Sequence, residues 1–190
     1  MLIYIHGFNS SAQSHKACLL QQRMETLGFA QWYAAPNLGH QPLQAMATIE
    51  ALLRGLDPAH VTVVGSSLGG YYATYLVEQY GVRAVLVNPA VRPYQLLATQ
   101  LGMQRNLYTG ESYELTPQHL LEWEQLEVAQ ISVERYWLIT ASGDEVLDYR
   151  EGLSRYKGCL TEVIEGGDHG CAEFVNYLDK VIAYWQRGRV

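Results

Sequence analysis

The chain has 190 residues, of which 48% are hydrophobic and 17% are charged, proportions typical of a soluble globular domain. Its formal net charge of −6, without any run of Lys or Arg, excludes the basic surface by which proteins bind nucleic acids or anionic membranes. The longest apolar runs fall far short of the ~20 residues that a membrane span needs, so we expect no membrane span.

Short apolar runs alternate with helix-length segments along almost the whole chain. Continuously apolar strands, each followed by an amphipathic helix, indicate a mostly parallel sheet with helices on both faces. No repeat or linker divides the chain, so we predict a single α/β domain over residues 1–190. The six predicted strands cover residues 2–5, 30–34, 60–64, 82–87, 135–140 and 159–164, and the predicted helices cover residues 14–27, 42–54, 67–80, 117–129, 145–157 and 172–186.

Two adjacent serines follow the third predicted strand, in the stretch VVGSSLGG at residues 63–70. A nucleophile elbow needs small residues two positions before and two positions after the reactive serine, because strand and helix approach closely there. Gly65 and Gly69 hold these positions around Ser67, whereas bulky residues hold them around Ser66. We therefore predict that Ser67 is the nucleophile. The alternative is that both serines only cap the helix that follows.

Residues 88–133 form a long irregular and helical insertion between the fourth and fifth predicted strands. Long insertions in compact α/β domains usually act as lids or caps, so we expect part of this segment to pack on the core and part to roof a binding pocket. Arg92, in the motif NPAVRP near its start, either meets an anionic group of an acyl donor or forms a structural salt bridge.

A serine nucleophile needs a base and an orienting acid, and in this type of fold they follow in the order Ser, acid, His. Asp144 comes directly after the fifth predicted strand and is the predicted acid. Asp148 is better explained as a helix N-cap, and Glu145 as a neighbour that flanks this helix. His169 follows the last predicted strand among glycines and is the predicted base.

The negative charge that develops on the substrate carbonyl oxygen requires donors already in place. One is the backbone N–H of Leu68, after the nucleophile, and the other is expected from the loop after the first strand, where we predict the N–H of Phe8. Phe8 also qualifies as an ordinary apolar side chain over the core, and His6 as a structural support. A spatial strand order of 2-1-3-4-5-6 would bring this loop and Ser67 to one crevice.

Metals and cofactors are not indicated. The six histidines lack the HxxxH and HExxH spacings of zinc sites, and neither a phosphate-binding loop nor a GxGxxG motif is present. Cys18, Cys159 and Cys171 are odd in number, widely spaced and without a CxxC motif, which favours a reducing compartment. We expect a cytoplasmic protein without a cofactor or metal.

Five motifs together, YIHGFNSS, VGSSLGGYYAT, VNPAVRP, GDEVLDYR and VIEGGxH, resemble the YqiA-like bacterial esterases, a small branch of the α/β-hydrolase superfamily. The resemblance runs in collinear order over nearly the full chain. It implies a compact hydrolase core that lacks the two leading strands of larger relatives, an acyl-ester hydrolase activity, and a triad of Ser67, Asp144 and His169. Asp168 and the pair GC around His169 depart from the family pattern and concern the pocket wall.

The sequence thus predicts an α/β-hydrolase fold with a six-stranded sheet and a lid, acting on a small-molecule acyl ester or thioester. A different interpretation is a non-catalytic α/β-hydrolase scaffold that binds a ligand or a protein partner, because fold alone does not imply catalysis. Covalent labelling of Ser67 and release of acid from an ester would separate the two.

Overall fold

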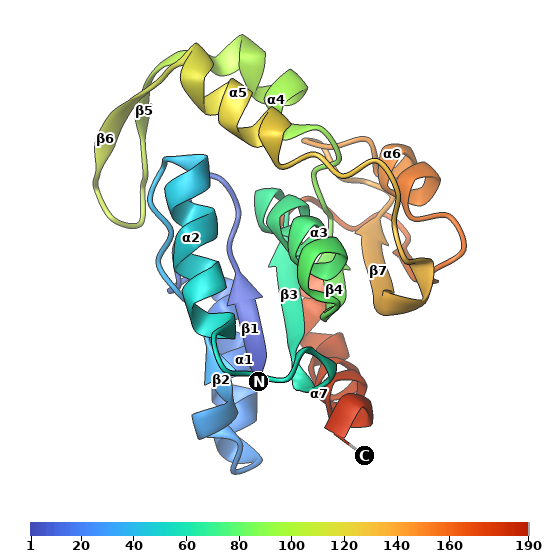
Figure 1. Ribbon diagram of the computed structural model, residues 1–190. Helices are drawn as coiled ribbons and strands as arrows, with labels where there is room; N and C mark the ends of the chain where they lie inside the picture. Colours follow the sequence, from blue (N-terminus) through green and yellow to red (C-terminus); the bar gives the residue numbers. More distant parts are fainter. Residues whose placement is uncertain (190) are drawn as a thin grey trace.

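The computed structural model describes residues 1–189 of the chain. Six strands form one parallel sheet in the order β2-β1-β3-β4-β7-β8 (Figure 1), which is the predicted order. The direction of succession reverses between β1 and β3, so loops after these two strands open a crevice at the carboxyl edge of the sheet. The strands are β1 (Leu2–Ile5), β2 (Tyr33–Ala34), β3 (Thr62–Ser66), β4 (Arg83–Val87), β7 (Tyr136–Ala141) and β8 (Leu160–Ile164).

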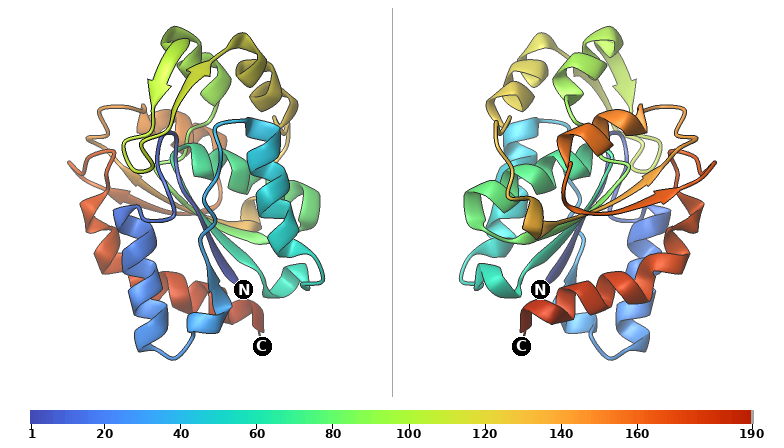
Figure 2. Two further views of the ribbon diagram at one scale, coloured as in Figure 1. Left: turned by 90° about the vertical axis from the view of Figure 1, so that its left-hand side faces the viewer. Right: turned by 90° about the vertical axis from the view of Figure 1, so that its right-hand side faces the viewer.

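Helices cover both faces of the sheet (Figure 2). Helices α1 (His15–Thr26) and α7 (Leu178–Gln186) pack on one face, whereas α2 (Pro42–Leu53), α3 (Leu68–Tyr80) and α6 (Tyr149–Arg155) lie on the other. Side chains of one strand alternate between the two faces, so β1 sends Ile3 and Ile5 into one apolar cluster and Leu2 and Tyr4 into the other. The predicted parallel α/β architecture is confirmed.

Several predicted boundaries are wrong. Residues 145–148 are not helical, because the Asp144 carboxylate accepts the N–H groups of Val146 and Leu147 and bends the chain into a turn before α6 begins. Residues 30–32 and 172–177 form 3₁₀ turns where strand and α-helix were predicted, and α5 ends at residue 125 rather than 129.

The insertion at residues 88–133 lies over the carboxyl ends of the strands, beyond α2 and α3 (Figure 1). It contains the short helix α4 (Pro93–Leu96), the antiparallel pair β5 (Gly102–Arg105) and β6 (Ser112–Leu115), and the helix α5 (Pro117–Gln125). The hairpin corrects the expectation of a purely irregular and helical stretch. Asn106 forms its turn by accepting the N–H groups of Tyr108 and Thr109, at 2.9 and 3.1 Å.

The two ends of the described chain lie close together at the amino ends of the strands, opposite the insertion (Figure 1). The Met1 ammonium donates to the His60 carbonyl at 2.7 Å, and Gly188 packs against the neighbouring carbonyl of Ala59. Among residues 1–189, none of the helices has the length and apolar character to cross a lipid bilayer.

Candidate active site

Ser67 occupies a strained turn between β3 and α3. Its backbone has φ 54° and ψ −121°, a conformation that residues other than glycine rarely adopt. The close approach predicted from the glycine spacing is present, since a Cβ at Gly65 would overlap the backbone of Gly69 and one at Gly69 would overlap the carbonyl of Ile5. This packing leaves room for glycine alone on both sides of Ser67 and directs the serine out of the sheet edge.

The structure brings the three predicted polar residues into one hydrogen-bonded row. Ser67 Oγ lies 3.1 Å from His169 Nε2, and His169 Nδ1 lies 2.8 Å from Asp144 Oδ2. A carboxylate only accepts, so the imidazole proton belongs on Nδ1, and Nε2 is free to accept from the serine hydroxyl. The Asp144 side chain is 1% exposed and that of His169 is 22% exposed, which keeps the pair out of bulk water.

Backbone groups satisfy the second oxygen of Asp144. Its Oδ1 accepts the N–H groups of Val146 and Leu147, each at 2.8 Å, while Oδ2 faces His169. A buried carboxylate that accepts two backbone N–H groups is held in one orientation. Asp148, the weighed alternative, points its carboxylate at the N–H of Arg150 at 3.0 Å and caps α6.

Two side chains that the sequence did not reveal as site residues hold the loop of His169. Asn88 donates to the carbonyls of Asp168 and His169 at 3.0 and 3.1 Å, and its Oδ1 accepts the Ala141 N–H at 2.8 Å. Glu145 accepts the His169 N–H at 3.0 Å, and this bond lowers the pKa of its carboxyl. The signal that the sequence offered for Asn88 was an asparagine directly after an apolar strand, and the structure gives this residue a φ of 43°.

Phe8 and Leu68, the two residues predicted to supply backbone N–H donors, lie close together. Both residues line one small pocket, and within residues 1–189 neither N–H donates a hydrogen bond. Gly7 packs against Ser67, where an added Cβ would lie 3.1 Å from the serine Cβ. The phenyl ring of Phe8 stacks edge-on against Trp123 of α5, with ring centroids 6.4 Å apart.

His6 supports the loop that carries Phe8. Its Nε2 accepts the Leu38 N–H at 3.0 Å, so its proton lies on Nδ1, 2.9 Å from the Gly7 carbonyl. Burial lowers the pKa of His6, which keeps the ring neutral at physiological pH. The ring therefore links the first-strand loop to residues 38–40.

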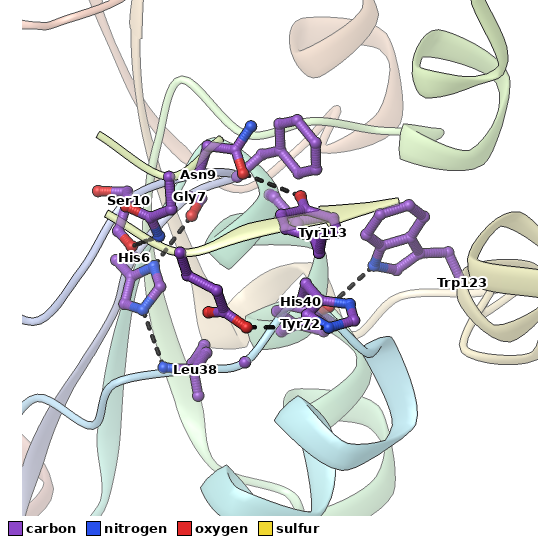
Figure 3. A pocket seen from close by; sticks show the side chains of 14 residues that line it. His6, Gly7, Asn9, Ser10, Leu38, His40, Tyr72, Tyr113 and Trp123 are labelled. Carbon is purple, nitrogen blue, oxygen red and sulfur yellow. Dashed lines mark hydrogen bonds and ion pairs between the residues drawn. The ribbon is translucent and has the colours of Figure 1, made fainter. Parts of the chain in front are cut away.

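The insertion closes a narrow pocket of about 30 Å³ beside the Phe8 and Leu68 backbone (Figure 3). Tyr113 of β6 donates to Asn9 at 2.8 Å, and Trp123 of α5 donates to Tyr72 of α3 at 2.8 Å. His40, for which the sequence indicated no role, stacks on Tyr113 with centroids 4.3 Å apart. A volume near 30 Å³ holds about one water molecule, so the insertion is firmly seated on this side.

A wider cavity of about 320 Å³ contains Ser67 and His169. Its wall comes from the first-strand loop, the start of α1, the end of β3, the hairpin tip and the His169 loop. The lining residues are Tyr4, Gly7, Phe8, Asn9, Ser10, Ser14, His15, Lys16, Ser66, Ser67, Tyr108, His169 and Gly170.

The three residues around His169 that depart from the family pattern lie in three different environments. Gly170 lines the wide cavity, Asp168 is exposed, and Cys171 is fully buried in the apolar cluster under α1 and α7. Only the glycine therefore changes the cavity wall directly.

Arg92 lies away from this cavity. Its side chain is exposed at the start of α4 and lines a separate hollow of about 290 Å³ together with Asp148 and Glu151. Among the residues that the structure describes, no carboxylate lies within ion-pair distance of Arg92, so neither of the two sequence-based interpretations has a contact in its support. Within the same part of the chain, no cluster of three His, Cys, Asp or Glu side chains is arranged to hold a metal.

Comparisons with known proteins agree with this architecture. A family model described as "Uncharacterised protein family (UPF0227)" matches residues 1–186. A UPF0227 protein from Serratia proteamaculans (strain 568) is 25% identical over 158 residues, which cover 78% of this chain and 77% of that protein.

Two solved structures are similar in fold. Alpha/beta hydrolase domain-containing protein 10 from mouse superposes with a TM-score of 0.71 at 17% identity, over 96% of this chain and 89% of that chain. The esterase domain of a Rhodothermus marinus protein gives a TM-score of 0.68 at 16% identity, over 98% of this chain and 85% of that chain. At these identities the likeness shows the fold, which is that of the α/β hydrolases.

Proposed function

The chain belongs to the UPF0227 family and has the α/β-hydrolase fold, and from these premises we propose that it is a serine hydrolase that cleaves carboxylic esters through an acyl-enzyme. The observation that carries the proposal is the row Asp144–His169–Ser67, with distances of 2.8 and 3.1 Å and the serine on a strained turn. Fold alone would not carry it, because the same fold serves many functions.

In the proposed reaction Ser67 Oγ bonds to the acyl carbon while its proton passes to His169 Nε2. The imidazolium then gives this proton to the leaving alcohol as the carbon–oxygen bond breaks, which leaves an acyl-serine. The same imidazole then takes a proton from water, whose oxygen bonds to the acyl carbon of the acyl-serine. As the bond between the acyl carbon and Ser67 Oγ breaks, the imidazolium returns the proton to Oγ and the acid is released. Asp144 keeps the imidazole in the required tautomer and stabilises its positive charge.

The N–H groups of Phe8 and Leu68 are the proposed donors to the carbonyl oxygen as it becomes negative. Their lack of other acceptors within residues 1–189 supports this role, since donors that are already oriented cost no reorganisation during the reaction. A thioester would react by the same steps, because the donors and the proton relay serve a thiol leaving group equally well.

Other features of the chain fit a small-molecule enzyme of a reducing compartment, for which we propose the cytoplasm. The three cysteines are all free in the structure, and two of them are partly exposed.

Labelling with a fluorophosphonate and hydrolysis of p-nitrophenyl esters test the proposal, with Ser67→Ala compared against Ser66→Ala. We expect one label per wild-type chain, and loss of both labelling and about 10⁶-fold of kcat in Ser67→Ala. Ser66 lines the same cavity and is the matched control, expected to retain labelling. A labelled, active Ser67→Ala variant, or a wild-type protein that takes no label and releases no acid, would contradict the proposal.

A further inference from the structure

Lys16 is a partly buried cation in the wall of the wide cavity. Its Nζ donates to the Gly170 carbonyl at 2.6 Å, next to His169, and two of its three N–H groups remain for other acceptors. Within the described residues no carboxylate lies within ion-pair distance of Nζ, although Asp168 and Asp144 are close enough to act on it electrostatically. Burial lowers the pKa of Lys16, because desolvation disfavours the charge, while Asp168 and Asp144 act in the opposite direction.

The helix that carries Lys16 begins at this cavity without a cap. Ser14 is the N-cap residue of α1, yet its side chain makes no capping bond and no acidic residue occupies the first turn. The first N–H groups of α1 and the positive end of its dipole are therefore left without a side-chain acceptor. Such a terminus is suited to an anion, but it needs independent support.

Lys16, in the first turn of the same helix, supplies a charged group in the cavity wall. Ser14 also belongs to this wall and is 8% exposed, but its Oγ atom is buried and lies within hydrogen-bond reach of the Tyr4 phenol. Tyr4 lies in the same wall, and burial raises the pKa of its phenol to about 12, so it stays a neutral donor.

The ionisable side chains in the cavity wall favour a negatively charged ligand. Among residues 1–189, two histidines and Lys16 line it and no Asp or Glu does, in a protein whose net charge is −6. The hollow beside Arg92 differs, because Asp148 and Glu151 line it. Lys16 would attract an anionic substituent next to the reacting ester, whereas Asp148 and Glu151 would repel such a substituent beside Arg92.

We propose that Lys16, at the uncapped start of α1, binds an anionic group carried by the substrate, so that the preferred substrates are esters with a carboxylate or phosphate near the scissile bond. This inference rests on the proposed hydrolase function. The anion accepts from the N–H groups of Lys16 that remain after its bond to the Gly170 carbonyl, and it holds the ester in the cavity beside Ser67.

Matched pairs of esters, one charged and one neutral, test this inference. They also show whether the anionic group that Lys16 binds lies on the acyl side or on the leaving group. Mono-p-nitrophenyl glutarate against p-nitrophenyl pentanoate places it on the acyl side, and 4-acetoxybenzoate against its methyl ester places it on the leaving group. We expect the wild type to favour the charged member of at least one pair about 10-fold or more in kcat/KM, mainly through KM. This preference is expected to disappear in Lys16→Met, to persist in Lys16→Arg and to remain in Lys157→Met, which changes an exposed lysine outside the cavity.

A readout without turnover keeps the two proposals separable. Glutarate and 4-hydroxybenzoate are titrated by calorimetry into Ser67→Ala, with and without Lys16→Met, and we expect at least one to bind only when Lys16 is present. If the wild type hydrolyses neutral esters but shows no charge preference and no such binding, the inference falls and the proposed function stands. If no ester is hydrolysed yet binding depends on Lys16, the proposed function falls. A purely structural Lys16 would lower the melting temperature and slow both members of each pair equally.

Discussion

Asp144 and Asp148 follow the same strand, yet their carboxylates meet different partners. Asp144 is 1% exposed and divides its oxygens between two backbone N–H groups and His169. Asp148 is half exposed, at 52%, and accepts from the first turn of α6. The difference is one of burial and geometry, so the two residues allow a direct comparison of an orienting role and a capping role.

Asp144→Asn is expected to lower kcat by about 10⁴-fold, because an amide favours the wrong imidazole tautomer. Asp148→Ala is expected to cost about 0.5–2 kcal/mol of stability through loss of the N-cap, with kcat nearly unchanged. Ester hydrolysis and urea denaturation of both variants check this. Equal kinetic damage from the two substitutions would contradict the assignment of Asp144 as the acid.

Asn88 connects β4, β7 and the His169 loop through three hydrogen bonds and is 2% exposed. Asn88→Ala is expected to lower stability by about 1–3 kcal/mol, because the buried Ala141 N–H loses its acceptor, and to lower kcat by loosening His169. Asn88→Gly tolerates the φ of 43° and isolates the effect of the hydrogen bonds. Wild-type kcat in Asn88→Gly would show that the side chain does not position His169.

Elements with strong apolar periodicity were predicted to within a residue or two, whereas segments shaped by side chain–backbone bonds were not. β3 and α3 follow directly from an apolar run, a glycine-flanked turn and an amphipathic stretch. The turn at residues 145–148 depends on Asp144 accepting two N–H groups, and the β5–β6 hairpin depends on Asn106 doing the same. Such bonds leave no periodic trace in the sequence.

In the same way, some residues of the candidate site could be predicted from the sequence and others could not. Ser67, Asp144 and His169 could be proposed because each follows a predicted strand, and the spacing of glycines distinguishes one serine from its neighbour. Lys16 and Asn88 could not be identified, because their significance lies in contacts with residues 154 and 80 positions away. Their roles depend on the packing of loops, which one sequence does not report.

The insertion is joined to the rest of the fold by a pair of histidines. His119 of α5 accepts the Thr116 N–H at 3.1 Å through Nδ1, and its Nε2 lies 3.0 Å from Nδ1 of His40. Because one ring must donate and the other accept, this arrangement requires both histidines to be neutral. Burial and the neighbouring His40 lower the pKa of His119, while Glu122 and the Thr116 backbone act in the opposite direction.

A lowered pKa means that His119 favours folding in its neutral form. Its contribution to the free energy of unfolding is therefore present above the usual histidine pKa of 6.5 and is lost as the pH falls below it. We expect stability to decrease from pH 7.5 to 5.5, and less steeply in His119→Asn, which retains an acceptor for Thr116 but cannot titrate. Urea denaturation at several pH values measures this. His6 titrates in the same direction and leaves a residual slope, so identical slopes in both proteins would contradict the role of His119.

At the scale of the whole molecule, the sheet separates two apolar cores. One core lies beneath α2 and α3 and continues into the insertion through Trp123, whereas the other lies beneath α1 and α7. The row of catalytic candidates lies at the carboxyl edge of the sheet, and the body of α7 lies near its opposite end (Figure 2). Stability and proposed activity are therefore supported by different parts of the structure.

Ile182→Ala on α7 is expected to lower the free energy of unfolding by about 2–5 kcal/mol, because the side chain is 2% exposed and its removal leaves a cavity. At temperatures where the variant stays folded, its kcat/KM for a neutral ester is expected to match the wild type. Denaturant titration and ester hydrolysis at 15 °C check the two statements. A large loss of kcat in the folded variant would show that the two cores are coupled.

The meeting of the two ends at the amino edge of the sheet has a practical consequence. Met1 and Gly188 lie beside neighbouring carbonyls, at His60 and Ala59, at the amino ends of the strands and opposite the insertion (Figure 1). A polypeptide fused at either end, or a tether to a solid support, would leave the molecule there and point away from Ser67. Immobilised or displayed copies would thus hold the mouth of the cavity toward the solution, where substrate arrives.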